Sequence, residues 1–307
     1  MVRVWFIFLV ISFLPLHVSA QPPIFSSGIN VVQVGVTVFD SDGRLVPDLE
    51  VDDFAIFEEG NAQSISYFAG SLFSDSEIVP LHLGVLFDSS GSMEQDEGFV
   101  KTAIIKFLNT VTYAKDITLV DFDSEVRVGR FAQADFPRLV ERVRNRQPRG
   151  MTALYDALGV YLDGAFSQDG RKVLLIYTDG EDTRSLTKFG EMTDLVRASD
   201  VTIYAIGFQK NLRPSVRNRQ RMRLQQLTDA TGGRSFFPDS VDKLDSIYQE
   251  ILAEFSARYM LGFVSSNERL DGMWRNLEIK LTNDRPYLKD ATIRTREGYY
   301  ALFKENN

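Results

Sequence analysis

The chain has 307 residues, of which 44% are hydrophobic and 25% charged, a composition typical of a soluble protein with one large or two ordinary domains. Its net charge of −8 argues against general nucleic-acid binding, which requires a basic surface. It contains no cysteine, so no disulfide can stabilise the fold. We therefore expect stability to come from a packed apolar core.

The first twenty residues have the pattern of a secretory signal peptide. Arg3 precedes an apolar run from Val4 to Leu16, and small residues at Ser19 and Ala20 suit a cleavage site after Ala20. The run is too short to span a membrane comfortably, although an uncleaved anchor is the alternative. No later stretch is apolar for long enough to cross a bilayer. The sequence thus predicts a secreted or periplasmic bacterial protein with no membrane span after signal removal.

Two segments, residues 21–78 and 258–307, have the pattern of β-strands. In the first, valines alternate from Val32 to Val38 and Asp42-Gly43 marks a turn. We expect the two segments to pair into one β-sandwich, with two separate small β units as the alternative. The strands predicted in them are Phe54–Phe57, Ile65–Phe68, Tyr259–Phe263, Trp274–Leu281, Thr292–Thr295 and Tyr299–Phe303.

The central segment, residues 79–257, alternates strand and helix patterns. Such alternation predicts an α/β domain, a doubly wound and mainly parallel sheet inserted between the flanking β segments. A hairpin from Ile117 to Phe131 would add one antiparallel edge strand. The predicted strands are Leu81–Phe87, Ile117–Phe122, Glu125–Phe131, Val173–Thr178, Val201–Gly207 and Ser235–Phe237. The predicted helices are Gln95–Val111, Phe136–Asn145, Ala153–Phe166, Lys188–Ala198, Asn218–Thr228 and Val241–Phe255.

A cluster of oxygen-bearing side chains follows the first central strand. The sequence LHLGVLFDSSGSM, from Leu81 to Met93, ends its apolar run at Asp88 and continues with Ser90 and Ser92 at every second position. If the chain stays extended beyond the strand, these three side chains point the same way. One carboxylate and two hydroxyls with no His or Cys beside them suit Mg²⁺, Mn²⁺ or Ca²⁺.

Two further segments supply polar side chains at matching places. Thr152 lies in a loop before a predicted helix, and Asp179-Gly180 follows the strand Val173–Thr178. In open α/β sheets, ligands bind beyond the carboxyl ends of the strands, at a topological switch point. Asp88 and Asp179 both follow such ends, so we expect them to face one site.

These three pieces, in this order, resemble the metal-ion-dependent adhesion site of the von Willebrand factor A domain. The family pattern is Asp-x-Ser-x-Ser, a distant Thr, and an Asp-Gly after a strand, and it matches Asp88, Ser90, Ser92, Thr152 and Asp179 without departure. The resemblance implies that the two serines bind the metal directly, while the threonine and the distant aspartate bind directly or through water. It implies that the first aspartate orients bound waters. It also implies a non-catalytic module that captures an exposed carboxylate of a protein ligand.

The flanking segments carry a second, less specific resemblance. Asp42-Gly43, Val51–Phe54 and Arg296–Tyr299 are similar to motifs of the exported bacterial group called VWFA-related acidobacterial-domain proteins. The two resemblances together cover almost the whole mature chain.

Other functions compete with this hypothesis. An Mg-dependent phosphatase of the haloacid dehalogenase type also places a nucleophilic Asp after its first strand, but it needs a second Asp two residues later, where this chain has Ser90. A third possibility is a metal-stabilised structural component of an envelope assembly. Simple helix capping by Ser90 or Ser92 would leave Thr152 and Asp179 without a role. The sequence does not specify the oligomeric state.

Two groups of arginines accompany the motif. The first leads into Thr152, where it would attract an acidic partner if it lay on the rim of the site. A solvated helix face is the preferred interpretation for both groups. The groups are Arg142, Arg144, Arg146 and Arg149, and Arg213, Arg217, Arg219, Arg221 and Arg223.

Overall fold

The computed structural model describes residues 31–70, 80–282 and 286–303, and the chain from Val31 onward belongs to one compact unit. The predicted signal peptide, residues 1–20, lies outside the described residues. No helix in the described part of the chain is both long and apolar enough to cross a membrane.

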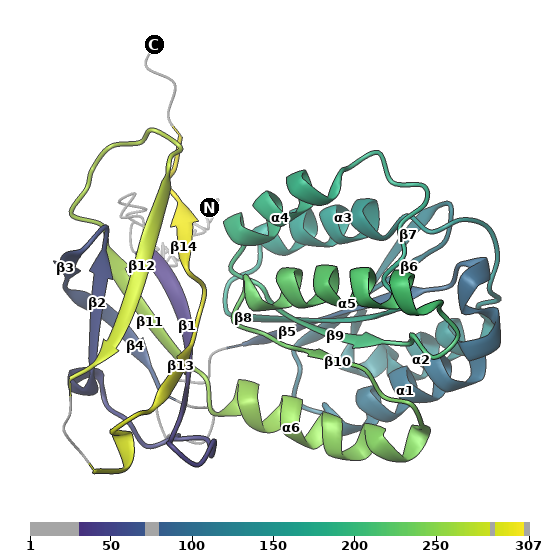
Figure 1. The fold of residues 1–307 in the computed structure, drawn as a ribbon, viewed down its shortest axis with the longest axis horizontal. Coiled ribbons are helices and arrows are strands. Elements are labelled where there is room, and N and C mark those ends of the chain that lie inside the picture. The colour runs from purple at the N-terminus through teal and green to yellow at the C-terminus, as the bar shows by residue number, and fades with distance from the viewer. Residues whose placement is uncertain (1–30, 71–79, 283–285, 304–307) are drawn as a thin grey trace, which may run out of the picture. The chain divides into compact units, whose positions relative to one another are not determined.

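A six-stranded sheet forms the centre of the α/β part of the chain, in the order β10-β9-β8-β5-β6-β7 (Figure 1). All neighbouring strands are parallel except β6 and β7, which form the predicted antiparallel hairpin. The predicted doubly wound, mainly parallel sheet is therefore confirmed. The strands are β5 (Leu81–Asp88), β6 (Asp116–Phe122), β7 (Val126–Ala132), β8 (Arg171–Thr178), β9 (Thr202–Gly207) and β10 (Ser235–Phe236).

Six helices cover the two faces of this sheet (Figure 1). Helices α1, α2 and α6 share one apolar core with it, and α3, α4 and α5 share the other. The helices are α1 (Glu97–Thr110), α2 (Phe136–Asn145), α3 (Leu154–Phe166), α4 (Phe189–Ala198), α5 (Pro214–Asp229) and α6 (Leu244–Ser256). The 3-10 turns are η1 (Val51–Asp53), η2 (Gly91–Asp96), η3 (Gln133–Asp135), η4 (Val241–Lys243) and η5 (Pro286–Leu288).

Strand β5 lies in the middle of the sheet because its side chains are apolar on both faces. Val85 and Phe87 pack into the core that contains α1, whereas Leu86 packs into the core that contains α3. The chain proceeds from β5 to β6 and β7 on one side, then returns to β8 on the other. The switch point of the sheet is thus between the carboxyl ends of β5 and β8.

The close packing of β5 against α3 gives a test of this core. A Cβ atom at Gly84 would lie 2.3 Å from the ring of Tyr161, whereas one at Gly98 on α1 would meet nothing within 4 Å. We expect Gly84→Ala to lower the free energy of unfolding by about 1–3 kcal/mol through overpacking. Gly98→Ala should raise it by about 0.5–1 kcal/mol. Urea denaturation measures both, and equal effects of the two substitutions would contradict the packing described.

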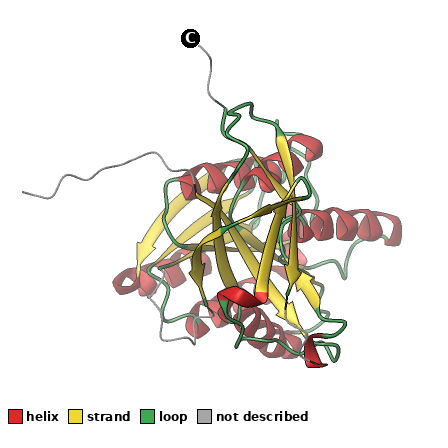
Figure 2. Cartoon of the chain, turned by 90° about the vertical axis from the view of Figure 1, so that its left-hand side faces the viewer, coloured by secondary structure: helices red, strands yellow, loops and turns green. Residues whose placement is uncertain are grey.

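The flanking segments form two antiparallel four-stranded sheets, β13-β1-β11-β4 and β14-β12-β2-β3 (Figures 1 and 2). Each sheet combines strands from before and after the central domain: Val34 on β1 faces Leu261 on β11, and Ile56 on β2 faces Ile279 on β12. These side chains share one buried core. The strands are β1 (Val31–Phe39), β2 (Phe54–Glu58), β3 (Asn61–Gln63), β4 (Ile65–Ala69), β11 (Tyr259–Val264), β12 (Trp274–Leu281), β13 (Thr292–Arg294) and β14 (Gly298–Tyr300).

The strand pairing therefore has the form of a sandwich interrupted by the α/β domain. The predicted domain boundaries at residues 78/79 and 257/258 stay predictions, because the described chain from Val31 onward is one compact unit.

Candidate metal centre

Asp88 is fixed at the switch point by hydrogen bonds to both of its carboxylate oxygens. It is the last residue of β5 and is fully buried. Its Oδ1 accepts from the backbone N–H of Ser90 at 3.0 Å, and its Oδ2 accepts from the Thr178 hydroxyl at 2.6 Å. Thr178 ends the neighbouring strand β8. The carboxylate is thus held rigidly between the two central strands.

Ser90 and Ser92 come together, but through a turn and not through an extended chain. Ser90 is extended (φ −75°, ψ 166°), whereas residues Gly91–Asp96 form the 3-10 turn η2. The prediction of extended backbone through Ser92 is therefore wrong. The two hydroxyl oxygens lie 3.1 Å apart. Ser90 precedes η2 without a side-chain capping bond, so the capping interpretation does not explain it.

The loop before Thr152 packs directly on this turn. The Gly91 N–H donates to the Gly150 carbonyl at 3.0 Å, and a Cβ atom at Gly91 would lie 3.2 Å from that oxygen. The Arg149 N–H donates to the Ser89 carbonyl at 2.9 Å. Thr152 itself is buried and tied by backbone bonds to Thr183, in the loop after β8. The three motif segments therefore meet at one edge of the sheet.

Asp179 adds a second buried carboxylate there. Its Oδ1 accepts from the Glu181 N–H at 2.8 Å. Its Oδ2 is buried and has no hydrogen-bond partner in the described part of the chain. Burial raises the pKa of Asp179, and the Glu181 N–H and the nearby Ser92 hydroxyl oppose that rise. An orphaned carboxylate oxygen beside two hydroxyls has the chemistry of a cation ligand.

The electrostatics of the site also fit a cation. Burial raises the pKa of Asp88 to about 7, and the nearby Asp179 carboxylate adds to the rise. Two carboxylates at one dry edge repel each other, and a divalent cation between them would offset both that repulsion and their desolvation. Among the described residues, no three His, Cys, Asp or Glu side chains form a group that could hold a metal ion without other ligands. The donor set is therefore two carboxylates with hydroxyls, which suits Mg²⁺, Mn²⁺ or Ca²⁺ better than zinc.

The pKa of Asp88 predicts how metal affinity depends on pH. Below pH 7 a proton occupies the carboxylate in the metal-free protein and must leave when the cation binds. We expect the association constant for Mg²⁺ or Mn²⁺ to fall about tenfold per pH unit below 7 and to level off above it. Titration calorimetry at pH 6, 7 and 8 measures this. A flat profile would mean that Asp88 titrates in its ordinary range.

The same pKa sets the stability of the metal-free protein. Between about pH 4, the ordinary carboxyl range, and pH 7, native Asp88 binds more protons than the unfolded chain does. This group therefore makes the metal-free fold less stable as the pH rises through that window.

Asp182 and Ser185, which the sequence places beside the site, support α3 instead. Asp182 Oδ2 accepts from the backbone N–H of Tyr155 at 2.9 Å, and Ser185 Oγ accepts from that of Asp156 at 3.0 Å. Both thereby satisfy free N–H groups in the first turn of α3, the helix that follows Thr152.

The prediction of a solvated helix face is wrong for most of the first arginine group: Arg142, Arg146 and Arg149 pair with buried aspartates, whereas Arg144 is exposed. The Arg142 Nε donates to the buried Asp121 at 2.7 Å, and Arg146 pairs with the buried Asp123. The Arg146 Nε also donates to the Ser89 hydroxyl at 2.9 Å. These arginines hold α2 and its following loop against the turn that carries the site. The sequence could not reveal this, because the pairing joins separate elements.

Thr178 and Ser89 are the two residues of the site that the sequence did not single out. Thr178 could have been found from its place at the end of a buried strand, one residue before Asp179. Ser89 lies between two motif positions, and its hydroxyl donates to the Phe122 carbonyl at 2.9 Å.

The fold and the donor set together define a doubly wound α/β domain with a cation-type site at its switch point. The family model of the von Willebrand factor type A domain matches residues 82–250, and the chain belongs to that family. Among curated proteins, no sequence matches the chain significantly.

Several solved structures are similar in fold at low sequence identity. A von Willebrand factor type A protein from Catenulispora acidiphila is 14% identical, with 85% of this chain and 76% of that one covered, and a TM-score of 0.48. The von Willebrand factor domain of the type V pili tip protein Mfa5 from Porphyromonas gingivalis is 15% identical, covering 59% and 97%, with a TM-score of 0.47. Proximal thread matrix protein 1 from the mussel byssus, described with a zinc-occupied MIDAS motif, is 18% identical, covering 59% and 47%, with a TM-score of 0.45.

Proposed function

We propose that this protein is an exported, non-catalytic binding module that captures an acidic group of a protein partner through a divalent cation. The ligand set would be Asp88, Ser90, Ser92, Thr152 and Asp179. The observation that carries the proposal is the buried, unpartnered Oδ2 of Asp179, on the same edge as the paired Ser90 and Ser92 hydroxyls. With Asp88 acting through bound waters, a cation held there by hydroxyls and one carboxylate keeps part of its charge, which attracts a carboxylate of a partner.

The setting of Asp88 supports a binding role over the phosphatase alternative. A nucleophilic aspartate must reach its substrate, yet Asp88 is fully buried and both of its oxygens already accept hydrogen bonds. The position two residues later is Ser90, which cannot serve as the general acid of that chemistry.

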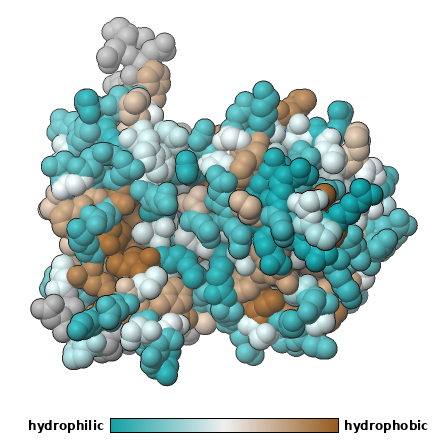
Figure 3. All heavy atoms as spheres, in the orientation of Figure 1, coloured by the Kyte–Doolittle hydropathy of each residue, from teal (hydrophilic) through white to brown (hydrophobic). Residues whose placement is uncertain are grey.

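Helix α5 supports an acidic partner. The surface over α5 is mainly hydrophilic (Figure 3). Among the described residues, neither the arginines of α5 nor Arg213, which precedes it, has a carboxylate within salt-bridge distance. Burial and the Asp179 carboxylate raise the pKa of Glu181, and the nearby Arg219 guanidinium opposes that rise. Unpaired positive charge beside the site would speed the approach of a negatively charged ligand. The arginines are Arg213, Arg217, Arg219, Arg221 and Arg223.

A capture experiment tests the proposal. The immobilised protein is incubated with envelope extract in Mg²⁺ and, in parallel, in EDTA. We expect specific capture only with Mg²⁺, lost in Asp88→Asn and kept in Asp163→Asn, an exposed aspartate of α3 with no bonding role. Capture of the same proteins in EDTA would overturn the proposal. Phosphatase turnover that requires Asp88 would favour the enzyme instead.

A further inference from the structure

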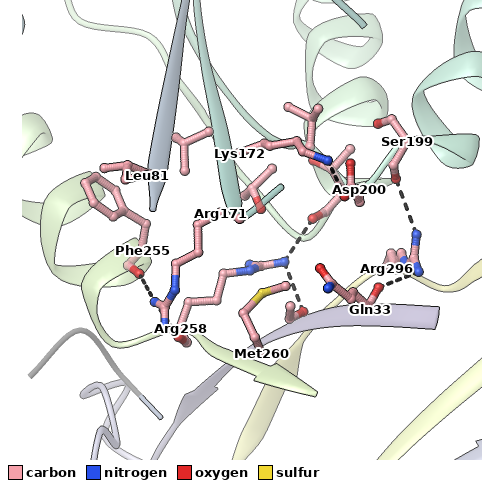
Figure 4. A pocket seen from close by; sticks show the side chains of 16 residues that line it. Gln33, Leu81, Arg171, Lys172, Ser199, Asp200, Phe255, Arg258, Met260 and Arg296 are labelled. Carbon is pink, nitrogen blue, oxygen red and sulfur yellow. Dashed lines mark hydrogen bonds and ion pairs between the residues drawn. The ribbon is translucent and has the colours of Figure 1, made fainter. Parts of the chain in front are cut away.

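A small, partly open cavity lies at the opposite end of the central sheet from the metal centre. It has a volume of about 30 Å³ and lies where the first residues of β8 meet strands β1 and β11 of the sandwich (Figure 4). Three arginines line it: Arg171 begins β8, Arg258 precedes β11, and Arg296 lies between β13 and β14.

These arginines are deeply buried and only partly satisfied. Their exposed fractions are 6%, 6% and 9% for Arg171, Arg258 and Arg296. Their terminal nitrogens donate mainly to backbone carbonyls, for example Arg171 to Arg258 at 2.9 Å, Arg258 to Gly35 at 3.0 Å and Arg296 to Gln33 at 2.5 Å. The Nε of each of the three is buried without a hydrogen-bond partner in the described part of the chain. Three orphaned, charged donors thus share one cavity.

The cavity also has too little negative charge to balance them. Its carboxylate, Asp200, pairs with Lys172 at 2.6 Å. The nearby Glu254 attracts Arg258, but it is also paired with Arg294 at 2.9 Å and with Arg234 at 3.4 Å. Backbone carbonyls accept hydrogen bonds but carry no net charge. Buried cations are normally paired, because desolvation of an unpaired charge costs several kcal/mol.

The protonation behaviour of the group is consistent with this deficit. Burial, together with repulsion from Arg258, lowers the pKa of Arg171 to about 10. Burial lowers the pKa of Arg296 to about 10, with Arg258 again adding to the effect and Asp200 opposing it. Even so, all three guanidinium groups are positive at neutral pH.

We propose that this cavity binds one small inorganic oxyanion of the phosphate or sulfate class, held by the free Nε groups of Arg171, Arg258 and Arg296. Oxyanions accept several hydrogen bonds at once, and the guanidinium group is the side chain best suited to them. The cavity volume of about 30 Å³ compares with the roughly 10–15 Å³ that one water needs. The cavity therefore has room for about two waters, or for one compact anion in their place. Water could fill the space and satisfy the donors, but it would leave the charge unbalanced.

Such an anion would join the sandwich to the α/β domain. Arg171 belongs to the central sheet, whereas Arg258 and Arg296 lie on strand connections of the sandwich. The Arg296 side chain already spans the two parts, since it donates to Ser199 on one side and to Gln33 on the other. An anion bound only by the folded protein raises its stability in proportion to the logarithm of anion concentration.

The test uses the purified protein in EDTA, in a buffer of constant ionic strength adjusted with gluconate. Phosphate and sulfate are titrated by calorimetry, and Tm is recorded over the same range. We expect saturable uptake of one anion per chain and a rise in Tm with concentration. Absence of saturable uptake, or chloride binding as tight as phosphate, would overturn the proposal and leave water as the occupant.

Variants separate the cavity from the general surface. Arg296→Met should weaken phosphate binding at least tenfold, whereas Arg138→Met, which removes an arginine whose side chain is 77% exposed, should leave it unchanged. Arg296→Lys keeps the positive charge but removes Nε. It replaces Arg296→Met in the phosphate titration if the methionine variant does not fold. Equal anion responses in the cavity and surface variants would overturn the assignment. Because EDTA is present, Asp88→Asn should bind phosphate as the unaltered protein does, which separates this site from the metal centre.

Discussion

Asp88→Asn is expected to lower the affinity for Mg²⁺ at least 100-fold while making the metal-free protein more stable at pH 8. The loss of affinity follows because asparagine carries no charge to offset that of the cation. The gain in stability follows from the pKa of about 7, since a shift of that size corresponds to about 4 kcal/mol unfavourable to the ionised form. The Thr178 hydroxyl loses its carboxylate acceptor, at a cost of about 1–3 kcal/mol. A net gain of about 1–3 kcal/mol remains.

Calorimetric titration of Mg²⁺ and urea denaturation in EDTA measure the two effects on the same sample. Asp163→Asn is the matched control, because it makes the same chemical change on the exposed surface of α3. It should alter neither quantity. If Asp88→Asn kept its Mg²⁺ affinity, or lost stability at pH 8, Asp88 would have a purely structural role. A loss of Mg²⁺ affinity together with a gain in stability would show that Asp88 serves metal binding and destabilises the metal-free protein.

The central strands were predictable because each contains a run of apolar residues, Leu83–Phe87 in β5 and Val173–Tyr177 in β8. β5 and β8 are buried along their whole length, and such runs are distinctive in a sequence. Helix α5 was predicted to start at Asn218 but starts at Pro214. Its first turn is polar and exposed, so no apolar periodicity marks it, and only proline at its first position signals the start.

The motif segments come together at one edge of the sheet, but not with the local geometry expected from the sequence. Alternation of side chains suggested that Asp88, Ser90 and Ser92 converge along an extended chain, whereas the 3-10 turn after Ser90 brings the two hydroxyls together. The turn depends on the approach of Gly91 to Gly150, a contact between distant segments. Sequence spacing carries no information on such contacts.

The buried arginines were beyond prediction for the same reason. Arg171, Arg258 and Arg296 are far apart in sequence, and each alone has the pattern of an ordinary surface residue. Only the arrangement of the sandwich against the start of β8 buries all three around one cavity. The charges of these three arginines indicate a common site only when the fold brings the side chains together.

One buried ion pair connects the N-terminal and C-terminal segments within one sheet of the sandwich. The Arg275 Nη1 on β12 donates to Glu58 Oε1 on β2 at 3.1 Å, and the two side chains are 5% and 2% exposed. Ser265 and Tyr299 also donate to the Glu58 carboxylate, at 2.9 and 3.2 Å. All three donors come from the C-terminal segment, whereas Glu58 comes from the N-terminal one. The pair therefore depends on the two segments having folded together.

Arg275→Met is expected to lower the free energy of unfolding by about 3–5 kcal/mol, because Glu58 would then be buried without a compensating cation. The double variant Glu58→Met/Arg275→Met should recover most of that loss, since replacing a whole buried pair with apolar side chains is often neutral. Urea denaturation of the single and double variants forms a double-mutant cycle. Arg269→Met, which removes an arginine whose side chain is 77% exposed on the same segment, is the control and should change stability little. Additive effects of the two single substitutions would mean that Glu58 and Arg275 do not interact. The joining of the N-terminal and C-terminal segments would then depend on their shared apolar core, between β1 and β11 and between β2 and β12, without help from the ion pair.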